Sequence, residues 1–150
     1  MEVKRIPDPD PIVLSDFLPY QVTRLADRIA RRTAAVAKAH DGLNISHWRV
    51  LAAVAEAPGR TANAVVAVTP MDKGIVSRAV KTLIDLRLLT RKASTEDGRL
   101  AHLFLTARGA RAYASMATEV RAIDDALSAS LSGAEKRAFL ATLEKLLACA

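Results

Sequence analysis

The sequence predicts a mainly α-helical protein that contains one small β-hairpin. Apolar residues recur at helical spacing along residues 12–40 and again along residues 107–148. Between these stretches, capping residues and helix breakers divide residues 43–87 into shorter helices, and an Asp-Gly turn separates two short apolar runs. A chain of 150 residues with 51% hydrophobic and 25% charged residues fits one folded domain with a substantial core.

The amino-terminal part is predicted to be an extended arm followed by a long helix. Three prolines in residues 1–11 exclude a regular helix there. The helix is expected over residues 12–40, because its apolar side chains form one stripe and Gly42 supplies a terminator just after it. The stripe consists of Leu14, Leu18, Val22, Leu25, Ile29 and Val36.

Three shorter helices are predicted over residues 46–57, 61–68 and 72–87. Ser46 and Thr61 are the expected N-caps of the first two, and proline-containing turns follow both of them. The third helix is polar and basic on one side. Three short helices in series with such a last member are typical of a helix-turn-helix domain.

A hairpin and two further helices complete the predicted order. Residues 88–93 and 100–106 have weak strand character, and Asp97-Gly98 between them is a strong hairpin signal. A long helix is expected over residues 106–130. The Ser-x-x-Glu pattern at Ser132 then predicts a capping box that opens a final helix. The apolar face of that helix consists of Phe139, Leu143, Leu146 and Leu147.

The predicted helix over residues 72–87 carries the side chains best suited to bind DNA. Lys73, Ser77 and Lys81 are spaced by four residues, and Gly74 and Arg78 lie beside them. The arginine suits a guanine edge or a phosphate, the serine and glycine permit close approach, and the lysines suit the phosphate backbone. A solvated amphipathic face is the alternative interpretation of this helix alone.

The charge distribution favours the DNA interpretation. Residues 72–111 hold nine Lys or Arg and four Asp or Glu, and this difference of +5 is most of the net charge of +6. Arg99 lies at the hairpin tip, where an arginine suits a narrow minor groove. Asp97 is a poor DNA contact and is better suited to brace the loop.

The motifs together resemble the MarR family of bacterial winged-helix transcription factors. The matching stretches are residues 43–51 (LNISHWRVL), residues 71–80 (MDKGIVSRAV), and Asp97-Gly-Arg99 followed by Leu105-Thr-Ala-Arg-Gly109. The resemblance implies a winged helix-turn-helix lobe over residues 43–106, with dimerisation helices over residues 12–40 and 107–148. It also implies a homodimer that binds a pseudo-palindromic operator, and repression that is relieved by a small aromatic or phenolic ligand.

Two positions depart from the family pattern. Pro70 stands in the turn before the recognition helix, where the family usually has glycine. Arg87 stands where the family usually has glycine after that helix. Arg87 is therefore expected either to adopt a left-handed backbone conformation or to shift the end of the helix.

Trp48, Arg49 and His47 lie near the position that the resemblance gives to an effector. The indole can stack on an aromatic ring, and Arg49 or His47 can pair with a carboxylate. Tyr20 and His40 on the first helix are further candidates for the same cleft. The alternative is that Trp48 is a core residue that bridges two parts of the protein, and this alternative is the favoured one.

Other classes of function have little support in the sequence. No phosphate loop or nucleophile elbow occurs, and the three histidines lack zinc spacing, so we expect no enzyme, cofactor or metal. The single cysteine, Cys149, is interpreted as a bystander. No signal peptide or run of about 18 apolar residues is evident, which predicts a cytoplasmic protein without a membrane partner. The alternative function is a helical dimer whose winged helix mediates protein–protein contact or non-specific DNA binding.

Overall fold

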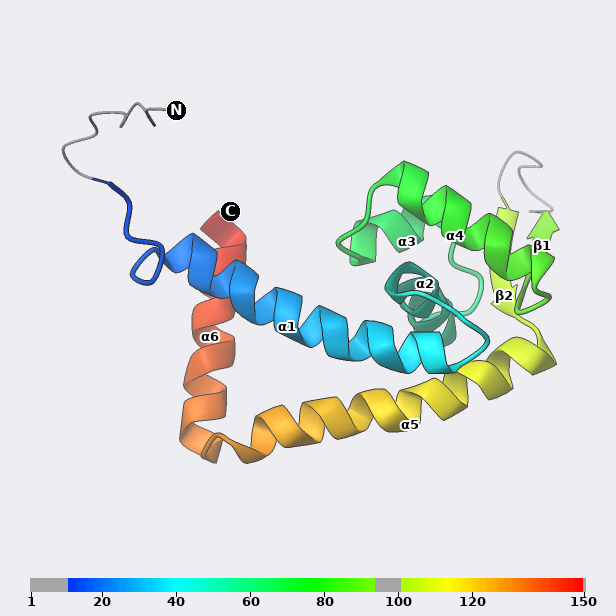
Figure 1. Ribbon diagram of the computed structural model, residues 1–150. Helices are drawn as coiled ribbons and strands as arrows, with labels where there is room; N and C mark the ends of the chain where they lie inside the picture. Colours follow the sequence, from blue (N-terminus) through cyan, green and yellow to red (C-terminus); the bar gives the residue numbers. More distant parts are fainter. Residues whose placement is uncertain (1–10, 94–100, 150) are drawn as a thin grey trace, which may run out of the picture.

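The computed structural model describes residues 11–93 and 101–149 of the chain. Within them the fold is mainly helical with one two-stranded antiparallel hairpin, as predicted. The winged lobe of α2, α3, α4, β1 and β2 lies at one end of the long helices α1 and α5, and α6 lies at the other end (Figure 1). The elements are α1 (Leu18–Ala39), α2 (Ile45–Glu56), α3 (Ala62–Val68), α4 (Lys73–Asp85), β1 (Leu89–Ala93), β2 (Ala101–Leu105), α5 (Ala107–Ala129) and α6 (Gly133–Cys149).

Helix α1 begins at Leu18, six residues later than residue 12, so the predicted start was wrong. Pro19 explains the difference, because proline is tolerated in the first turn of a helix and disrupts a helix interior. A helix that began at residue 12 would have placed Pro19 in its interior. The preceding residues form a turn in which the amide of Asp16 donates to the carbonyl of Val13 over 3.0 Å.

The N-cap of α2 is Asn44. The sequence had predicted Ser46, and that prediction was wrong. The Asn44 side chain accepts from the backbone amide of His47 over 3.0 Å, and Nδ1 of His47 accepts from the backbone amide of Asn44 over 3.1 Å. This reciprocal pair satisfies two amides that the helix leaves without partners. The predicted cap Thr61 is confirmed, and so is the Ser132–Glu135 capping box.

Helix α4 ends at Asp85, and Arg87 adopts a left-handed conformation with φ of 58°. The amide of Leu88 donates to the carbonyl of Leu83 over 2.8 Å, and the amide of Arg87 donates to that of Ile84 over 2.9 Å. These two bonds form a Schellman motif, which usually has glycine at the left-handed position. The first of the two outcomes expected for Arg87 is therefore the one observed.

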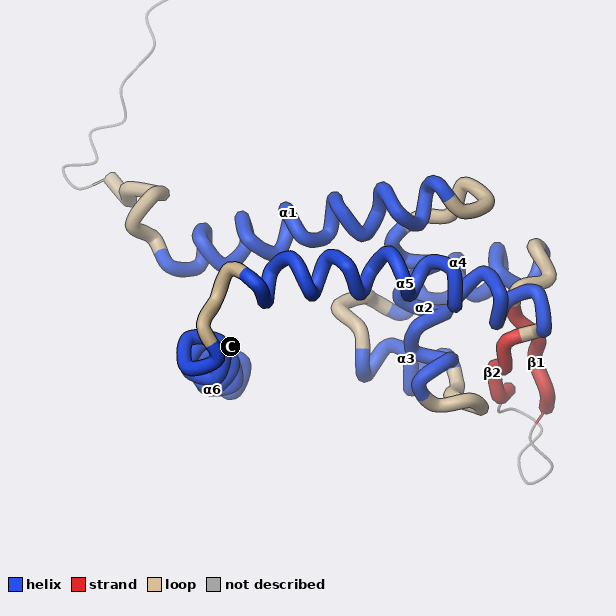
Figure 2. Tube along the Cα trace, turned by 90° about the horizontal axis from the view of Figure 1, so that it is seen from below, coloured by secondary structure: helices blue, strands red, loops and turns tan. Residues whose placement is uncertain are grey.

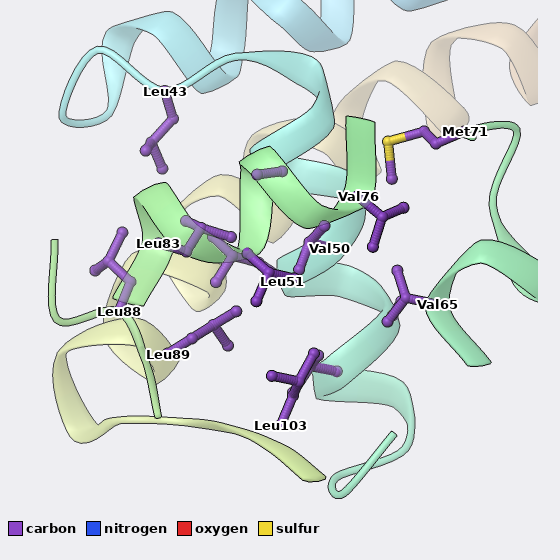
Figure 3. Close-up of a cluster of buried hydrophobic side chains, with 14 of the residues drawn as sticks. Leu43, Val50, Leu51, Val65, Met71, Val76, Leu83, Leu88, Leu89 and Leu103 are labelled. Atoms are coloured by element: carbon purple, nitrogen blue, oxygen red, sulfur yellow. The ribbon is translucent and has the colours of Figure 1, made fainter. Parts of the chain in front are cut away.

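The core lies inside the winged lobe (Figure 3). Helix α4 turns Val76, Val80 and Leu83 inward with no exposed surface. The strands pair from Leu89 opposite Leu105 to Ala93 opposite Ala101, and the hairpin covers one side of this core. The other fully buried large side chains are Val50, Leu51, Val54, Val65, Leu88, Leu103 and Met116.

The other end of the molecule is apolar but exposed. Helix α6 has no buried residue, and it stands away from the lobe across the ends of α1 and α5 (Figure 2). Large exposed apolar side chains gather on the segment before α1, on the first half of α1 and on α6. They include Leu18, Val22, Leu25, Phe139, Leu140, Leu146 and Leu147. No helix in the described part of the chain is long and apolar enough to span a membrane.

Candidate nucleic-acid interface

The exposed face of α4 carries all five of its predicted DNA-binding residues. The helix buries Val76, Ala79, Val80 and Leu83 against the lobe, which leaves its opposite side in solvent. Because this packing fixes the helix axis and rotation, the polar side chains project from a rigid support. These five residues, all of them exposed, are Lys73, Gly74, Ser77, Arg78 and Lys81.

Two carboxylates near α4 affect its basic face. Asp72 is the N-cap, and its Oδ1 accepts from the amide of Ile75 over 2.7 Å. Lys81 Nζ lies 2.8 Å from Oδ2 of Asp85, and the hydrogen bond and charge of Asp85 raise the pKa of the Lys81 ammonium. The sequence predicted Lys81 as a contact to the phosphate backbone, and the i,i+4 spacing of Lys81 and Asp85 was the available signal for this ion pair.

Arg78 also lines a cleft of about 400 Å³ between α4 and the start of α2. His47 lines the same cleft, and partial burial lowers the pKa of its imidazole. Since Nδ1 accepts a hydrogen bond from the Asn44 amide, the neutral ring carries its proton on Nε2. The structure therefore separates His47 from Trp48 and Arg49, the effector residues with which it had been grouped. Asn44, Ser46, Ile75, Ala79 and Thr82 complete the lining.

The first strand of the hairpin adds two exposed cations beside α4. Arg91 and Lys92 lie on β1, and the ammonium of Lys92 is 5.1 Å from the centroid of the Phe104 ring. This ring supports the charged end of the lysine by a cation–π contact. The predicted minor-groove residue Arg99 and the predicted brace Asp97 lie outside the described residues.

The end of α4 is fastened to the start of α5. The Thr106 hydroxyl donates to the carbonyl of Arg87 over 2.7 Å. The guanidinium of Arg108 donates to the carbonyl of Leu86 over 3.0 Å and to the carboxylate of Asp41 over 3.2 Å. These bonds join the residues that follow α4 to the start of α5 and to the turn that follows α1. No sequence pattern predicts this junction, because Asp41 and Arg108 are 67 residues apart.

Trp48 and Arg49 line a second cleft, of about 460 Å³, on the other side of α2. The indole stacks on the ring of Tyr113 in α5, with centroids 5.5 Å apart and planes inclined by 10°. Trp48 therefore bridges α2 and α5, as the favoured interpretation expected, and it also forms part of a cleft wall. Glu56 and the turn at Pro70 before α4 line this cleft as well, together with Ala52, Ala53, Val68 and Thr69.

The two remaining effector candidates lie elsewhere. His40 Nε2 is 2.6 Å from Oε1 of Glu119, and it faces a polar cleft that also includes Arg111. Tyr20 lies near the start of α1, at the end remote from the winged lobe. Of the five candidates, the structure brings only Trp48 and Arg49 together in one cleft. Among the residues described, no three His, Cys, Asp or Glu side chains form a group suited to a metal ion.

The comparisons with known proteins agree with this geometry. Residues 41–100 match a family model described as the MarR family. The chain resembles the crystal structure of a MarR-family transcriptional regulator from Silicibacter pomeroyi, with 27% identity over 91% of this chain and 92% of that one, and a TM-score of 0.78. No curated protein matches the chain.

Two further solved structures share the fold. One is the transcriptional repressor CouR bound to a 23-mer DNA duplex, with 22% identity, coverage of 92% of this chain and 99% of that one, and a TM-score of 0.77. The other is BpsR of Bordetella bronchiseptica, whose DNA binding is regulated by 6-hydroxynicotinic acid. It has 23% identity, coverage of 91% and 97%, and a TM-score of 0.72.

Proposed function

We propose that the chain is a transcriptional regulator of the MarR family. In this proposal it is a sequence-specific DNA-binding repressor that works as a homodimer and is released by a small aromatic ligand. The exposed polar and basic face of α4, rigidly backed by the core of the winged lobe, carries this proposal. The DNA-bound state of CouR, which has the same fold, supports DNA as the partner.

The side chains of α4 have different proposed roles in DNA binding. Arg78 is the candidate for reading a base, because a guanidinium can donate two hydrogen bonds to a guanine edge. Lys73 supplies charge to the phosphate backbone, and Ser77 allows close approach. Lys81 is shared with Asp85, so it contributes to phosphate binding only when it leaves that carboxylate.

A second copy of the chain is the proposed partner of the exposed apolar end. A groove of about 440 Å³ between α1 and α6 is lined almost entirely by apolar side chains, among them Leu25, Phe139 and Leu143. Exposed apolar surface of this extent marks an association site in a soluble protein. A two-fold dimer also presents two copies of α4, which suits a pseudo-palindromic operator.

The cleft beside Trp48 is the proposed effector site. A flat ring fits against the stacked Trp48–Tyr113 pair, and Arg49 supplies a cation for a carboxylate or phenolate. The turn at Pro70 forms part of the cleft wall and directly precedes α4, so an occupant can bias the position of the basic face. The regulation of BpsR by an aromatic acid supports this ligand class.

Salt-titrated binding to the DNA upstream of its own gene tests the repressor function. We expect much tighter binding to that fragment than to a scrambled duplex of equal length, with affinity that falls steeply as salt rises. Arg78→Ala is expected to weaken binding by about 1–3 kcal/mol and to relax sequence preference. Equal, weak binding of the parent protein to both fragments would contradict the proposal.

The single tryptophan offers a direct test of the effector site. Benzoate, salicylate and 6-hydroxynicotinate are suitable probes, and binding beside Trp48 is expected to quench its fluorescence in a saturable way. Arg49→Gln should weaken this quenching, whereas Arg111→Gln, in the separate polar cleft, should leave it unchanged. Saturable binding that neither quenches Trp48 nor depends on Arg49 would place the effector elsewhere.

A further inference from the structure

Helix α1, which lies outside the winged lobe, carries a strip of positive charge. Its 22 residues contain five basic side chains and one acidic side chain, Asp27, so the helix has a net charge of +4. The cations are Arg24, Arg28, Arg31, Arg32 and Lys38. All of them are exposed.

Four of these cations lie on one face of α1. Residues 24, 28, 31 and 38 recur at intervals of three, four and seven, which is the repeat of one side of a helix. This face is opposite the one that buries Thr33 and Ala37. Only Arg31 has an acidic partner among the described residues, Asp27 at 2.8 Å, and both of these side chains are largely exposed.

The strip runs from the proposed dimer end toward the DNA-binding lobe. Figure 1 shows α1 extending from α6 to a position beneath the lobe, with α5 along its other side. The face that carries the strip is turned away from α5, because the buried face of α1 packs on α5 and α2. We expect a dimer joined through α6 and the first half of α1 to place two such strips between the two winged lobes.

We propose that this strip binds the sugar-phosphate backbone of the operator between its two half-sites. The inference rests on the proposed function, since a duplex that reaches both copies of α4 must cross the space between the lobes. From residue 24 to residue 38 the strip is about 21 Å long, which matches about six base pairs of duplex. Guanidinium groups suit phosphates and carry no base information, so the strip adds affinity that is independent of spacer sequence.

DNA fits this face better than an acidic protein or membrane does. Between residues 24 and 38 the strip holds no exposed large apolar side chain. The exposed Leu18, Val22 and Leu25 lie on another side of α1, where the proposed dimer covers them and removes the apolar face that a membrane-binding helix would need. The same molecule also presents the exposed basic face of α4, which is the proposed DNA-binding face. One long polyanion can therefore neutralise both surfaces at once, with release of counterions from each.

The test measures the salt dependence of operator binding. The operator is first located by footprinting the parent protein on the DNA upstream of its own gene. The affinity of each protein for this operator is then measured by fluorescence anisotropy between about 50 and 200 mM KCl. The variant Arg24→Gln/Arg28→Gln removes two cations of the strip that have no acidic partner within residues 11–93 and 101–149. The matched control Arg121→Gln/Arg137→Gln removes the same charge from exposed positions on α5 and α6.

We expect the strip variant to bind roughly tenfold more weakly and to lose about 0.9 from the log–log salt slope for each phosphate contact removed. The control should retain the slope of the parent protein. A second operator, with uncharged methylphosphonate linkages between the half-sites, should lower the slope of the parent and of the control. The salt slope of the strip variant should fall little further on this duplex, because its contacts to those phosphates are already absent.

Three results would overturn the inference. The first is a strip variant with the slope of the parent, and the second is an equal loss in the strip variant and the control. The third is an unchanged slope accompanied by lost binding to vesicles of acidic phospholipid, which would assign the strip to a membrane. If the parent protein itself does not prefer its operator to a scrambled duplex, the proposed function fails independently of the strip.

Discussion

At the scale of single residues, Arg87 is where the fold imposes a conformation that its side chain disfavours. Its φ of 58° lies in the left-handed region, where a Cβ atom costs roughly 1 kcal/mol or more relative to glycine. The surrounding hydrogen bonds hold it there, since the amides of Arg87 and Leu88 and the carbonyl of Arg87 all have partners.

Arg87→Gly is therefore expected to stabilise the protein by about 0.5–1 kcal/mol, after the greater freedom of glycine in the unfolded chain is subtracted. Urea denaturation, with the midpoint and slope fitted together, measures the effect. Arg87→Ala removes the same charge but keeps the Cβ atom, so its stability should stay near that of the parent. Equal stabilisation by both variants would assign the effect to charge and not to the backbone.

Gly109 is a residue whose side chain is excluded by packing. A Cβ atom built at this position would lie 1.9 Å from the carbonyl oxygen of Leu88, which is a backbone atom and cannot rotate away. Gly109→Ala must therefore separate α5 from the end of α4, at a cost of about 1–3 kcal/mol or more. The sequence motif Leu105-Thr-Ala-Arg-Gly109 marked this position, but only the structure shows the carbonyl that makes glycine necessary.

Gly133→Ala is the matched control for that prediction. There a Cβ atom would meet only the end of the flexible Arg137 side chain, at 3.4 Å. Alanine also favours helix more than glycine does, so this variant should be at least as stable as the parent in thermal unfolding. A Gly109→Ala protein that unfolds at the parent temperature would show that α5 shifts without cost.

At the scale of elements, the sequence predicted every helix and strand of the described residues but not all of their ends. Apolar periodicity located the elements, because it reflects which face is buried. The start of α1 was missed because the apolar stripe continues through residues 12–17, which form a turn. The cap of α2 was missed because Asn44 and Ser46 are both good caps, and only the reciprocal bond with His47 selects Asn44.

That capping box predicts a pH dependence of stability. Burial lowers the pKa of His47 below its usual 6.5, so the folded protein favours the neutral imidazole. Protonation also removes Nδ1 as the acceptor for the Asn44 amide. The unfolded chain therefore binds more protons than the folded chain below about pH 6.5, and stability falls as the pH drops through the unfolded-state pKa toward the lower folded-state pKa.

Urea unfolding of the parent protein and of His47→Gln at pH 7.5 and pH 5.5 measures this contribution. The parent is expected to lose more stability than the variant on acidification, because glutamine does not titrate. His102→Gln is a control, since it removes a histidine from a different part of the lobe, where Nδ1 lies 2.7 Å from the carbonyl of Gly59. The same pH response in the parent and in His47→Gln would exclude His47 as its source.

At the scale of the whole molecule, the apolar face of α6 contributes to stability only when another protein surface covers it. None of its residues is buried, yet Phe139, Leu146 and Leu147 are among the exposed apolar side chains of the chain. The sequence could predict this apolar stripe but not whether it packs within the chain or on a partner, since periodicity is the same in both cases. A single copy leaves the stripe open, which agrees with the proposed dimer.

Phe139→Glu/Leu146→Glu is therefore expected to yield a monomer. The winged lobe has its own core, so circular dichroism should still report a folded, helical protein. Operator binding should weaken by several orders of magnitude, because one copy reaches only one half-site. Ala141→Glu lies on the opposite side of α6 by helical spacing and should preserve both the dimer and operator binding. Sedimentation equilibrium decides between the outcomes, and a double variant that remains dimeric at micromolar concentration would exclude this face of α6 as the interface.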